Sequence, residues 1–326
     1  ANHAEVVAVP KNLCVRLEAD ADLAKACYNT LGAIALQGVR QADMRLGETC
    51  AVIGLGLIGQ LACLELRASG VNVVGIDVSA AAVKTASEHC ADLALTRNDP
   101  GIKEKILDYT DGRGVDAVLI AAATSSLDPV NFAGAICRRK GRVVVLGAVP
   151  TGFDRDPYYY KKELELRMSC SYGPGRYDLN YEEKGIDYPA AYVRWTEKRN
   201  MQAFQQLVHS GRIDLQYLTT HVFKFEDAPK AYDIVLTHSE PFLGIVLEYD
   251  TTKEHTERSI VTDAAAAAIK SDAPGIAFIG AGSYAQGNLL PNLPAAERAP
   301  RIAVMTNSGT TSKRVAEKFH FGRATS

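Results

Sequence analysis

A glycine pattern early in the chain has the residue types and spacing of a site for phosphates. The segment AVIGLGLIG places Gly54, Gly56 and Gly59 directly after a hydrophobic run, where a helix is expected to begin. In such a G-x-G-x-x-G turn the first glycine permits the tight bend, the second lets the backbone approach a pyrophosphate, and the third lets helix and strand pack closely. The helix N-terminus adds free N–H groups and a positive dipole end. The pattern predicts a dinucleotide site.

An aspartate at the end of the next hydrophobic run strengthens this prediction. Asp77 closes the run 71–77 and lies 18 residues after Gly59. A carboxylate there accepts hydrogen bonds from the adenosine ribose and repels a 2′-phosphate, so NAD is favoured over NADP. The alternative is a glycine-rich turn with an unrelated aspartate, but spacing, order and strand context favour the site.

A second copy of the pattern stands near the end of the chain, in GIAFIGAGSYA, with Ala285 in place of the third glycine. Alanine is permitted at this position, where the helix packs on the strand. The following strand, 301–305, ends without a carboxylate, and Lys313 and Arg314 are suited to a 2′-phosphate, so this copy is open to NAD or NADP. Only 52 residues follow Pro274, so we expect an incomplete site, and a plain strand–helix unit is the alternative. Its expected cofactor contacts are Gly280, Gly282, Ser283, Tyr284 and Ala285.

Residues 50–149 alternate between short hydrophobic runs and helical patterns, and this alternation has to position the first glycine turn. Near-continuous Val, Ile and Leu runs are typical of parallel strands covered on both faces. We therefore predict an α/β fold with a doubly wound parallel sheet. The expected strands are 50–54, 71–77, 92–95, 117–121 and 142–146, and the expected helices are 58–69, 79–90, 100–110 and 126–139.

The flanking segments are less regular. The aromatic-rich stretch 153–195 is either a helix and a loop packed by its own rings, or a loop that lines a substrate or oligomer surface. In the same stretch Lys161, Lys162 and Glu163 are either substrate contacts or a solvated helix face. The remaining predictions are extended pieces at 4–9 and 13–17, helices at 21–45, 200–210 and 227–237, a strand at 243–249, a linker at 250–274 in which Asp263 caps a helix 264–268, and a truncated second strand–helix unit at 275–326.

Composition and charge exclude several classes of protein. The formal charge is only −2 over 326 residues, so no basic field indicates nucleic acid or an anionic membrane as a partner. No apolar run approaches the roughly 20 residues that a membrane-spanning helix needs. The seven cysteines stand at least 13 positions apart, which excludes CxxC pairs and favours a reduced, cytoplasmic protein. No HxH or HxxxH pair indicates a metal site.

The order of these segments resembles the medium-chain dehydrogenase/reductase superfamily, the zinc-type alcohol dehydrogenases and their relatives. The resemblance covers about residues 1–249 and rests on HAEVVAVP, LGAIALQGVRQADMRLGETCAVIGLGLIGQ, VVGIDVS, GRGVDAVLIAAAT and GRVVVLGAVP. It implies that 31–242 form an NAD-binding Rossmann domain, and that 1–30 and 243–249 are remnants of a GroES-like catalytic domain. The residues implied to hold NAD are Gly54, Gly56, Leu57, Ile58, Gly59 and Asp77, with Ala122, Gly147 and Ala148 beside the nicotinamide half.

The same resemblance bears on zinc and on assembly. The family's zinc ligands would mostly precede residue 1, and no cysteine aligns at 29–32, although Cys27 is close. We therefore do not expect zinc. The family also implies a homodimer formed through the edge of the Rossmann sheet.

The last segment resembles a second family. IAFIGAGSYAQGNLLPNLP followed by RIAVMTNSGTTSKRVAEKFHFG looks like the start of a Gfo/Idh/MocA-type oxidoreductase. Fusion of the two types, with the stretch SYGPGRYDLNYEEKGIDYPAAYVRWTEKRN, resembles the bi-domain oxidoreductases of bacterial polysaccharide gene clusters.

These patterns predict a fragment of an NAD(P)-dependent oxidoreductase. Its intact parent would transfer a hydride to or from an alcohol or carbonyl on a small, sugar-like substrate or a sugar nucleotide. The chain starts without Met and stops within a pattern, so we expect the fragment itself to be nearly inactive. Two alternatives stay open, a zinc-free reductase of the quinone or enone type and a non-catalytic dinucleotide-binding module. The sequence names no catalytic residue.

Overall fold

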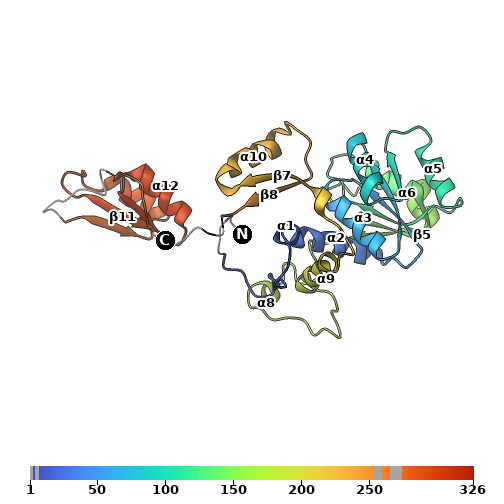
Figure 1. Cartoon of the computed structure of the whole chain (residues 1–326), viewed down its shortest axis with the longest axis horizontal. Helices are drawn as coiled ribbons and strands as arrows, with labels where there is room; N and C mark the ends of the chain where they lie inside the picture. The colour runs from blue at the N-terminus through green and yellow to red at the C-terminus, as the bar shows by residue number, and fades with distance from the viewer. Residues whose placement is uncertain (1–2, 4–6, 251, 253–258, 265–273) are drawn as a thin grey trace. The chain divides into compact units, whose positions relative to one another are not determined.

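The computed structural model describes residues 3, 7–250, 252, 259–264 and 274–326. The chain divides into two compact units, unit 1 with residues 1–249 and unit 2 with residues 250–326. Both are drawn in Figure 1.

A six-stranded parallel sheet forms the centre of unit 1, in the order β3-β2-β1-β4-β5-β6. Ile53, the last residue of β1, pairs with Ile76 on one side and Ile120 on the other. The chain order reverses between β1 and β4, and ligands of doubly wound sheets bind outside the strand ends at such a point. The strands are β1 Thr49–Ile53, β2 Asn72–Asp77, β3 Leu93–Thr96, β4 Val115–Ile120, β5 Cys137–Val145 and β6 Glu165–Met168.

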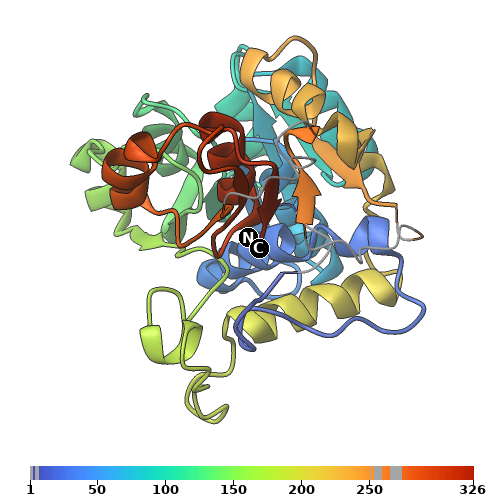
Figure 2. The same ribbon diagram turned by 90° about the vertical axis from the view of Figure 1, so that its left-hand side faces the viewer.

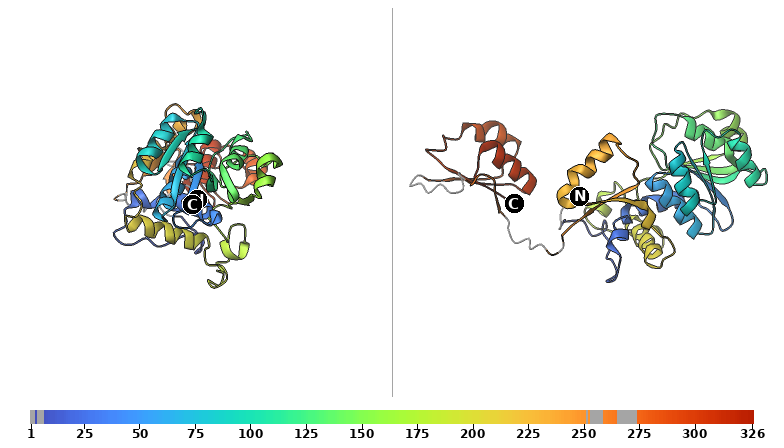
Figure 3. Two further views of the ribbon diagram at one scale, coloured as in Figure 1. Left: turned by 90° about the vertical axis from the view of Figure 1, so that its right-hand side faces the viewer. Right: turned by 45° about the horizontal axis from the view of Figure 1, so that its top comes forward.

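Helices cover both faces of this sheet, as the two views of Figure 3 show. Alternate residues of each central strand point to opposite faces, so Cys50 and Val52 belong to one buried cluster and Ala51 and Ile53 to another. The doubly wound α/β fold predicted from the sequence is thereby confirmed. The helices are α2 Asn29–Ala42, α3 Leu57–Ala68 and α4 Ala80–His89 against the first cluster, and α5 Ile102–Tyr109 and α6 Asp128–Ile136 against the second.

The segment before the sheet differs from its prediction. Residues 7–9 and 13–17 form no strand and belong to none of the sheets of the described residues, while 4–6 lie outside the described residues. The helix predicted at 21–45 is two helices, α1 Leu23–Ala26 and α2. Asp22 caps the short first helix by accepting hydrogen bonds from the N–H groups of Ala24 and Lys25.

The aromatic-rich stretch contains a strand that the sequence did not predict. Strand β6 extends the sheet beyond β5, and a turn of α7 Tyr160–Lys162 precedes it. Lys162 does not lie on a solvated helix face: its Nζ donates to the carbonyls of Gly134, Ala135 and Cys137 at 2.9, 2.8 and 2.6 Å. It therefore satisfies the free carbonyl groups at the end of α6.

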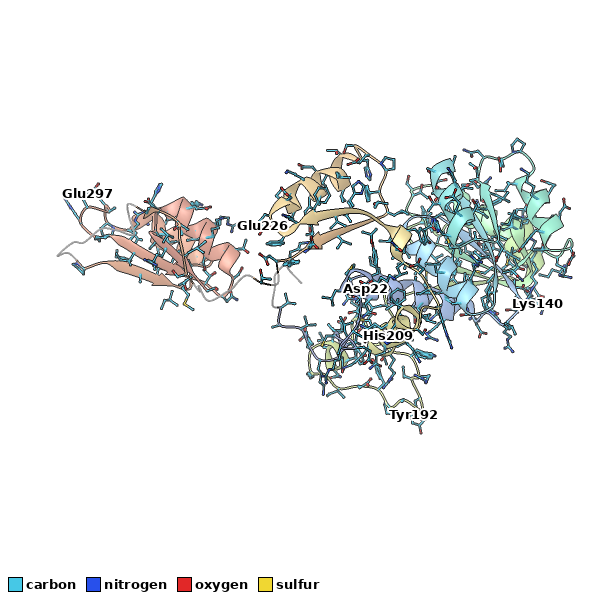
Figure 4. All side chains as sticks on the ribbon, in the orientation of Figure 1. Asp22, Lys140, Tyr192, His209, Glu226 and Glu297 are labelled. Carbon is cyan, nitrogen blue, oxygen red and sulfur yellow. The ribbon has the colours of Figure 1, made fainter. Side chains whose placement is uncertain are left out.

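Beyond β6, residues 171–195 form a long loop that contains the short helix α8 Leu179–Glu182 and leads into α9 Glu197–His209. The rings of Tyr181 and Tyr188 stack with centroids 5.4 Å apart, and Arg199 donates to the carbonyls of Val193 and Tyr188. The loop is thus packed partly by its own rings, as one of the two predictions had it. Tyr192 in this loop is 88% exposed and labelled in Figure 4.

Unit 1 ends in a two-stranded parallel sheet of β7 Thr219–Lys224 and β8 Gly244–Glu248. Helix α10 Ala228–Thr237 connects the two strands, in agreement with the predicted helix, and β8 agrees with the predicted strand. Strand β7 was not predicted. It follows a short turn of helix, Gln216–Leu218.

Unit 2 has a four-stranded sheet in the order β10-β11-β12-β9, red and orange in Figure 2. Strand β9 lies within the predicted linker 250–274, so part of that segment belongs to a sheet and the linker prediction is corrected there. Of the predicted helix 264–268, residues 265–268 lie outside the described residues. The elements are β9 Ser259–Val261, β10 Ile276–Ile279, β11 Arg301–Met305, α12 Gly309–Phe319 and β12 Arg323–Thr325.

Among the described residues, no helix is both long enough and apolar enough to span a bilayer.

Candidate functional site

The first glycine turn bends at the carboxyl end of β1 as the sequence predicts. Gly54 has φ +97°, a conformation that side chains with a Cβ rarely adopt, and its N–H donates to Ile76 O at 2.8 Å. A Cβ at this position would lie 2.6 Å from Ala122 N. The neighbouring strand end therefore leaves no room for any residue but glycine.

The other two glycines of the turn differ in how much space surrounds them. A Cβ on Gly59 would lie 1.9 Å from Gly54 O, so this glycine permits the contact between helix and strand. A Cβ on Gly56 would meet no atom within 4 Å. Gly56 is also the N-cap of α3 and provides no side-chain cap, which leaves the N–H groups at this helix end, including those of Leu57 and Ile58, to a ligand. The open space lies where a pyrophosphate is expected.

Asp77 stands beside this turn. Its Oδ2 accepts the N–H of Leu55 at 2.6 Å, and its Oδ1 accepts the N–H of Ser79 at 2.7 Å. A carboxylate has about four lone-pair sites, so about two are left for other donors. The aspartate is half-buried at the end of β2 and fits the hydroxyls of a ribose next to the phosphates.

The loops after β4 and β5 bring the remaining predicted residues together. Gly147 donates from its N–H to Ile120 O at 2.8 Å, and a Cβ on it would lie 2.1 Å from Ala122 O. The N–H of Thr124 donates to Ala148 O at 2.9 Å and joins the two loops. Ala122, Gly147 and Ala148 therefore lie side by side on the far side of the turn from Asp77.

The second glycine turn has a similar bend in a less complete setting. Gly280 has φ +86° and donates to Met305 O at 2.9 Å, and Ala285 is buried. The N–H of Gly282 is bonded to Gly280 O at 2.8 Å. Ser283 precedes Tyr284, whose side chain is 71% exposed. Strand β10 is the sheet edge among the described residues, so no strand faces this turn from the other side.

Two buried acids near the sheet escaped the sequence analysis. Glu65 on α3 is fully buried, and burial raises its pKa well above the usual range while Arg40 lowers it. Glu197 at the start of α9 is also fully buried, and burial together with Glu182 raises its pKa to about 7. Among the described residues, the carboxyl of Glu65 accepts no hydrogen bond, whereas a hydrogen bond from Tyr172 acts against the rise in the pKa of Glu197. Neither residue stands in a motif that could have revealed its burial.

A zinc site requires several donor side chains that come together. Within the described ranges, no three His, Cys, Asp or Glu side chains come together to hold an ion. The thiol of Cys27 donates to Ala24 O at 3.0 Å. The thiol of Cys27, the cysteine closest to the expected ligand position, is thus engaged with the backbone.

A cavity of about 680 Å³ lies away from the glycine turn. It is enclosed by residues 16–29 and by α9, and two of its lining residues, Asp22 and His209, are labelled in Figure 4. The residues of the glycine turn and Asp77 are not part of its lining.

Comparison with known proteins finds similarity to dehydrogenases and reductases. Residues 58–183 match the family described as zinc-binding dehydrogenase. D-guloside 3-dehydrogenase of Shigella flexneri is 28% identical over 214 residues, which cover 63% of this chain and 55% of that protein. Probable D-xylulose reductase A of Emericella nidulans is 26% identical over 241 residues, which cover 72% and 60%. The structure of alcohol dehydrogenase TADH from Thermus sp. ATN1 superposes with a TM-score of 0.58 at 20% identity, over 72% of this chain and 60% of that one.

The chain is thus similar to zinc-type dehydrogenases over residues 58–183, and to two sugar-related oxidoreductases at 26–28% identity over 63–72% of its length. The chain spans only 55–60% of the length of these relatives. The expectation that zinc is absent is not supported, because the matching family is described as zinc-binding. The family match lies within unit 1, so the resemblance of unit 2 to Gfo/Idh/MocA-type proteins stays a prediction.

Proposed function

We propose that unit 1 is the NAD-binding part of a dehydrogenase. The observation that carries the proposal is the pairing of an open turn at Gly56 with a carboxylate, Asp77, fixed against the same turn. The turn offers backbone N–H groups to two phosphates, and the aspartate offers acceptors to the ribose next to them. Every residue of this set lies at the ends of β1 and β2.

NAD is the preferred cofactor in this proposal. Asp77 is held on both of its oxygens by backbone N–H groups, so it cannot turn away from a ligand without losing both bonds. A 2′-phosphate on the ribose would face the negative charge of the Asp77 carboxylate. Bound NAD would supply the hydride acceptor, and the protein would hold it against Ala122, Gly147 and Ala148 on the nicotinamide side.

The proposed substrate class is a secondary alcohol or the matching carbonyl on a sugar-like molecule. The support comes from the relatives, which are named D-guloside 3-dehydrogenase and D-xylulose reductase. We extend the proposal to the division of the chain: 1–30 and 243–249 as parts of a GroES-like domain, 31–242 as the NAD-binding domain, and 275–326 with β9 as a second unit.

Titration calorimetry with NAD and NADP tests the cofactor proposal. We expect NAD to bind and NADP to bind at least tenfold more weakly. Binding of neither cofactor would overturn the proposal, and preference for NADP would overturn the role of Asp77. Turnover of a polyol and sugar panel by a protein that contains this chain and the remaining length of its relatives tests the substrate class, and activity confined to quinones or enones would favour the alternative reductase.

A further inference from the structure

A glutamine directly after the third glycine is bonded back to the turn it follows. Gln60 lies in α3 and is fully buried. Its Nε2 donates to Leu55 O, five residues earlier, at 3.1 Å. Its Oε1 accepts from the thiol of Cys90 at 2.9 Å and from the hydroxyl of Tyr217 at 3.1 Å.

The three partners fix which way the amide points. Leu55 O can only accept, so it requires the NH₂ end of the side chain, while the Cys90 thiol and the Tyr217 hydroxyl can both donate to the oxygen. Cys90 follows α4, and Tyr217 lies just before β7, where its ring stacks on His89 at 4.0 Å. The orientation of Gln60 is therefore supported by two elements outside its own helix.

The consequence for the turn follows from the planarity of the peptide bond. The Leu55–Gly56 peptide is trans, so its C=O and N–H point in opposite directions. Because Gln60 holds the carbonyl, the N–H of Gly56 is directed away from Gln60, and a Cβ on Gly56 would meet no atom within 4 Å. The Gln60 side chain thus sets the direction in which the backbone N–H of Gly56 points.

The second glycine turn contains the same contact. Gln286 also follows the third position of its motif, and its Nε2 donates to Ala281 O at 2.9 Å, again five residues back. Leu55 and Ala281 hold equivalent places, each directly after the first glycine. Two independent units of the chain therefore repeat one arrangement of glutamine and turn.

We infer that Gln60 is a positioning residue for the diphosphate of the cofactor. It acts through the Leu55–Gly56 peptide, whose N–H it turns toward the phosphates, and Tyr217 and Cys90 hold it in place. The inference rests on the proposed function and adds to it a residue outside the glycine motif. It concerns the affinity for ligands that carry a diphosphate, such as NAD and ADP.

The first test compares the dissociation constants of NAD, ADP and adenosine for the wild-type chain and for Gln60→Met. Loss of one hydrogen bond of this kind is expected to weaken NAD and ADP about three- to tenfold, and to leave adenosine, which has no phosphate, unchanged. Gln37→Met is the matched control, since Gln37 is another buried glutamine, bonded to Asn200 at 3.2 Å. Gln37→Met should lower the melting temperature without changing the dissociation constants of NAD and ADP.

Tyr217→Phe is a milder variant in case Gln60→Met does not fold. It removes one of the two donors to Oε1 and should weaken NAD about twofold. Tyr217→Phe should weaken NAD binding less in the Gln60→Met variant than in the wild type, because the two changes act on one hydrogen-bond network.

Gln60→Glu gives a signature that a purely structural role does not. A protonated carboxyl can still donate to Leu55 O, whereas an ionised one places negative charge against that carbonyl. Relative to wild type, the affinity for NAD should be nearly normal at pH 5 and fall progressively toward pH 8.5. A pH-independent ratio, or equal losses for adenosine and NAD, would overturn the inference while leaving NAD binding itself intact. Failure of the wild-type chain to bind NAD would overturn the proposed function and the inference with it.

Discussion

The carboxylate of Asp77 lies 2.6 Å from the backbone nitrogen of Leu55 and thereby ties the end of β2 to the glycine turn after β1. The aspartate thus has two tasks in the proposed site, one in shaping the turn and one in recognising the ribose.

Asp77→Asn should change the choice of cofactor. The amide keeps the size of the side chain but removes the negative charge that opposes a 2′-phosphate. We expect the affinity for NAD to fall about tenfold, in line with the loss of a hydrogen bond to a charged group, and the ratio of NADP to NAD affinity to rise. Titration calorimetry measures both. Asp99→Asn, a change on the surface near Lys105, is the control and should alter neither constant.

Gly56→Ala should weaken NAD binding without lowering the melting temperature, whereas Gly59→Ala should destabilise the fold. Gly56 has φ −68° and open space above it, so alanine should leave the melting temperature unchanged and, by filling the phosphate position, weaken NAD at least tenfold. Gly59→Ala places a methyl group 1.9 Å from Gly54 O. It should destabilise unit 1 by about 2 kcal/mol or more, as overpacking does. Thermal unfolding with and without NAD distinguishes the two, and a stable Gly56→Ala variant with normal affinity would contradict the placement of the phosphates.

Lys162→Met should destabilise unit 1. The variant keeps the apolar part of the side chain but leaves three carbonyls at the end of α6 without their shared donor. The expected cost is about 2 kcal/mol, the size of hydrogen bonds to a charged group. Urea unfolding followed by the fluorescence of Trp195, the one tryptophan of the chain, measures it. Lys161→Met is the matched control, because the neighbouring Lys161 is exposed, and equal effects of the two changes would refute the capping role.

The sequence predicted the central strands because they are buried on both faces. Strands β1, β2 and β4 consist almost wholly of buried residues and read as unbroken hydrophobic runs. By contrast, β6 is an edge strand with exposed Glu165 and Met168 at its ends, and β7 alternates between half-buried and exposed positions. These strands therefore lack the unbroken hydrophobic run from which the central strands could be predicted.

The same distinction holds for the site. Gly54, Gly59 and Asp77 could be predicted because their roles depend on local backbone geometry and on a fixed spacing. The role of Gln60 depends on Cys90 and Tyr217, which stand 30 and 157 residues away. One local signal was present all the same: a glutamine follows the third motif position in both copies.

Glu197 should make the stability of unit 1 depend on pH. Burial and the nearby carboxylate of Glu182 raise its pKa to about 7, while Arg176 and Tyr172 act in the opposite direction. Since the folded-state pKa lies above the unfolded value of about 4.5, the folded state binds the proton more tightly. The stability from this group is therefore complete below pH 4.5 and is lost as the pH rises toward and through 7.

Glu197→Gln should remove this dependence, because the amide is neutral at every pH. At 1.4 kcal/mol for each unit of pKa, the wild-type chain should lose on the order of 3 kcal/mol between acidic and alkaline pH that the variant retains. Urea unfolding at intervals from pH 4.5 to 8.5, again followed by Trp195, gives the two curves. Glu183→Gln, at an exposed position in the same loop, should leave the slope of the wild-type curve unchanged. Parallel curves for the wild type and Glu197→Gln would show that the Glu197 carboxyl is already ionised in the folded protein, with Arg176 as the charge that compensates for its burial.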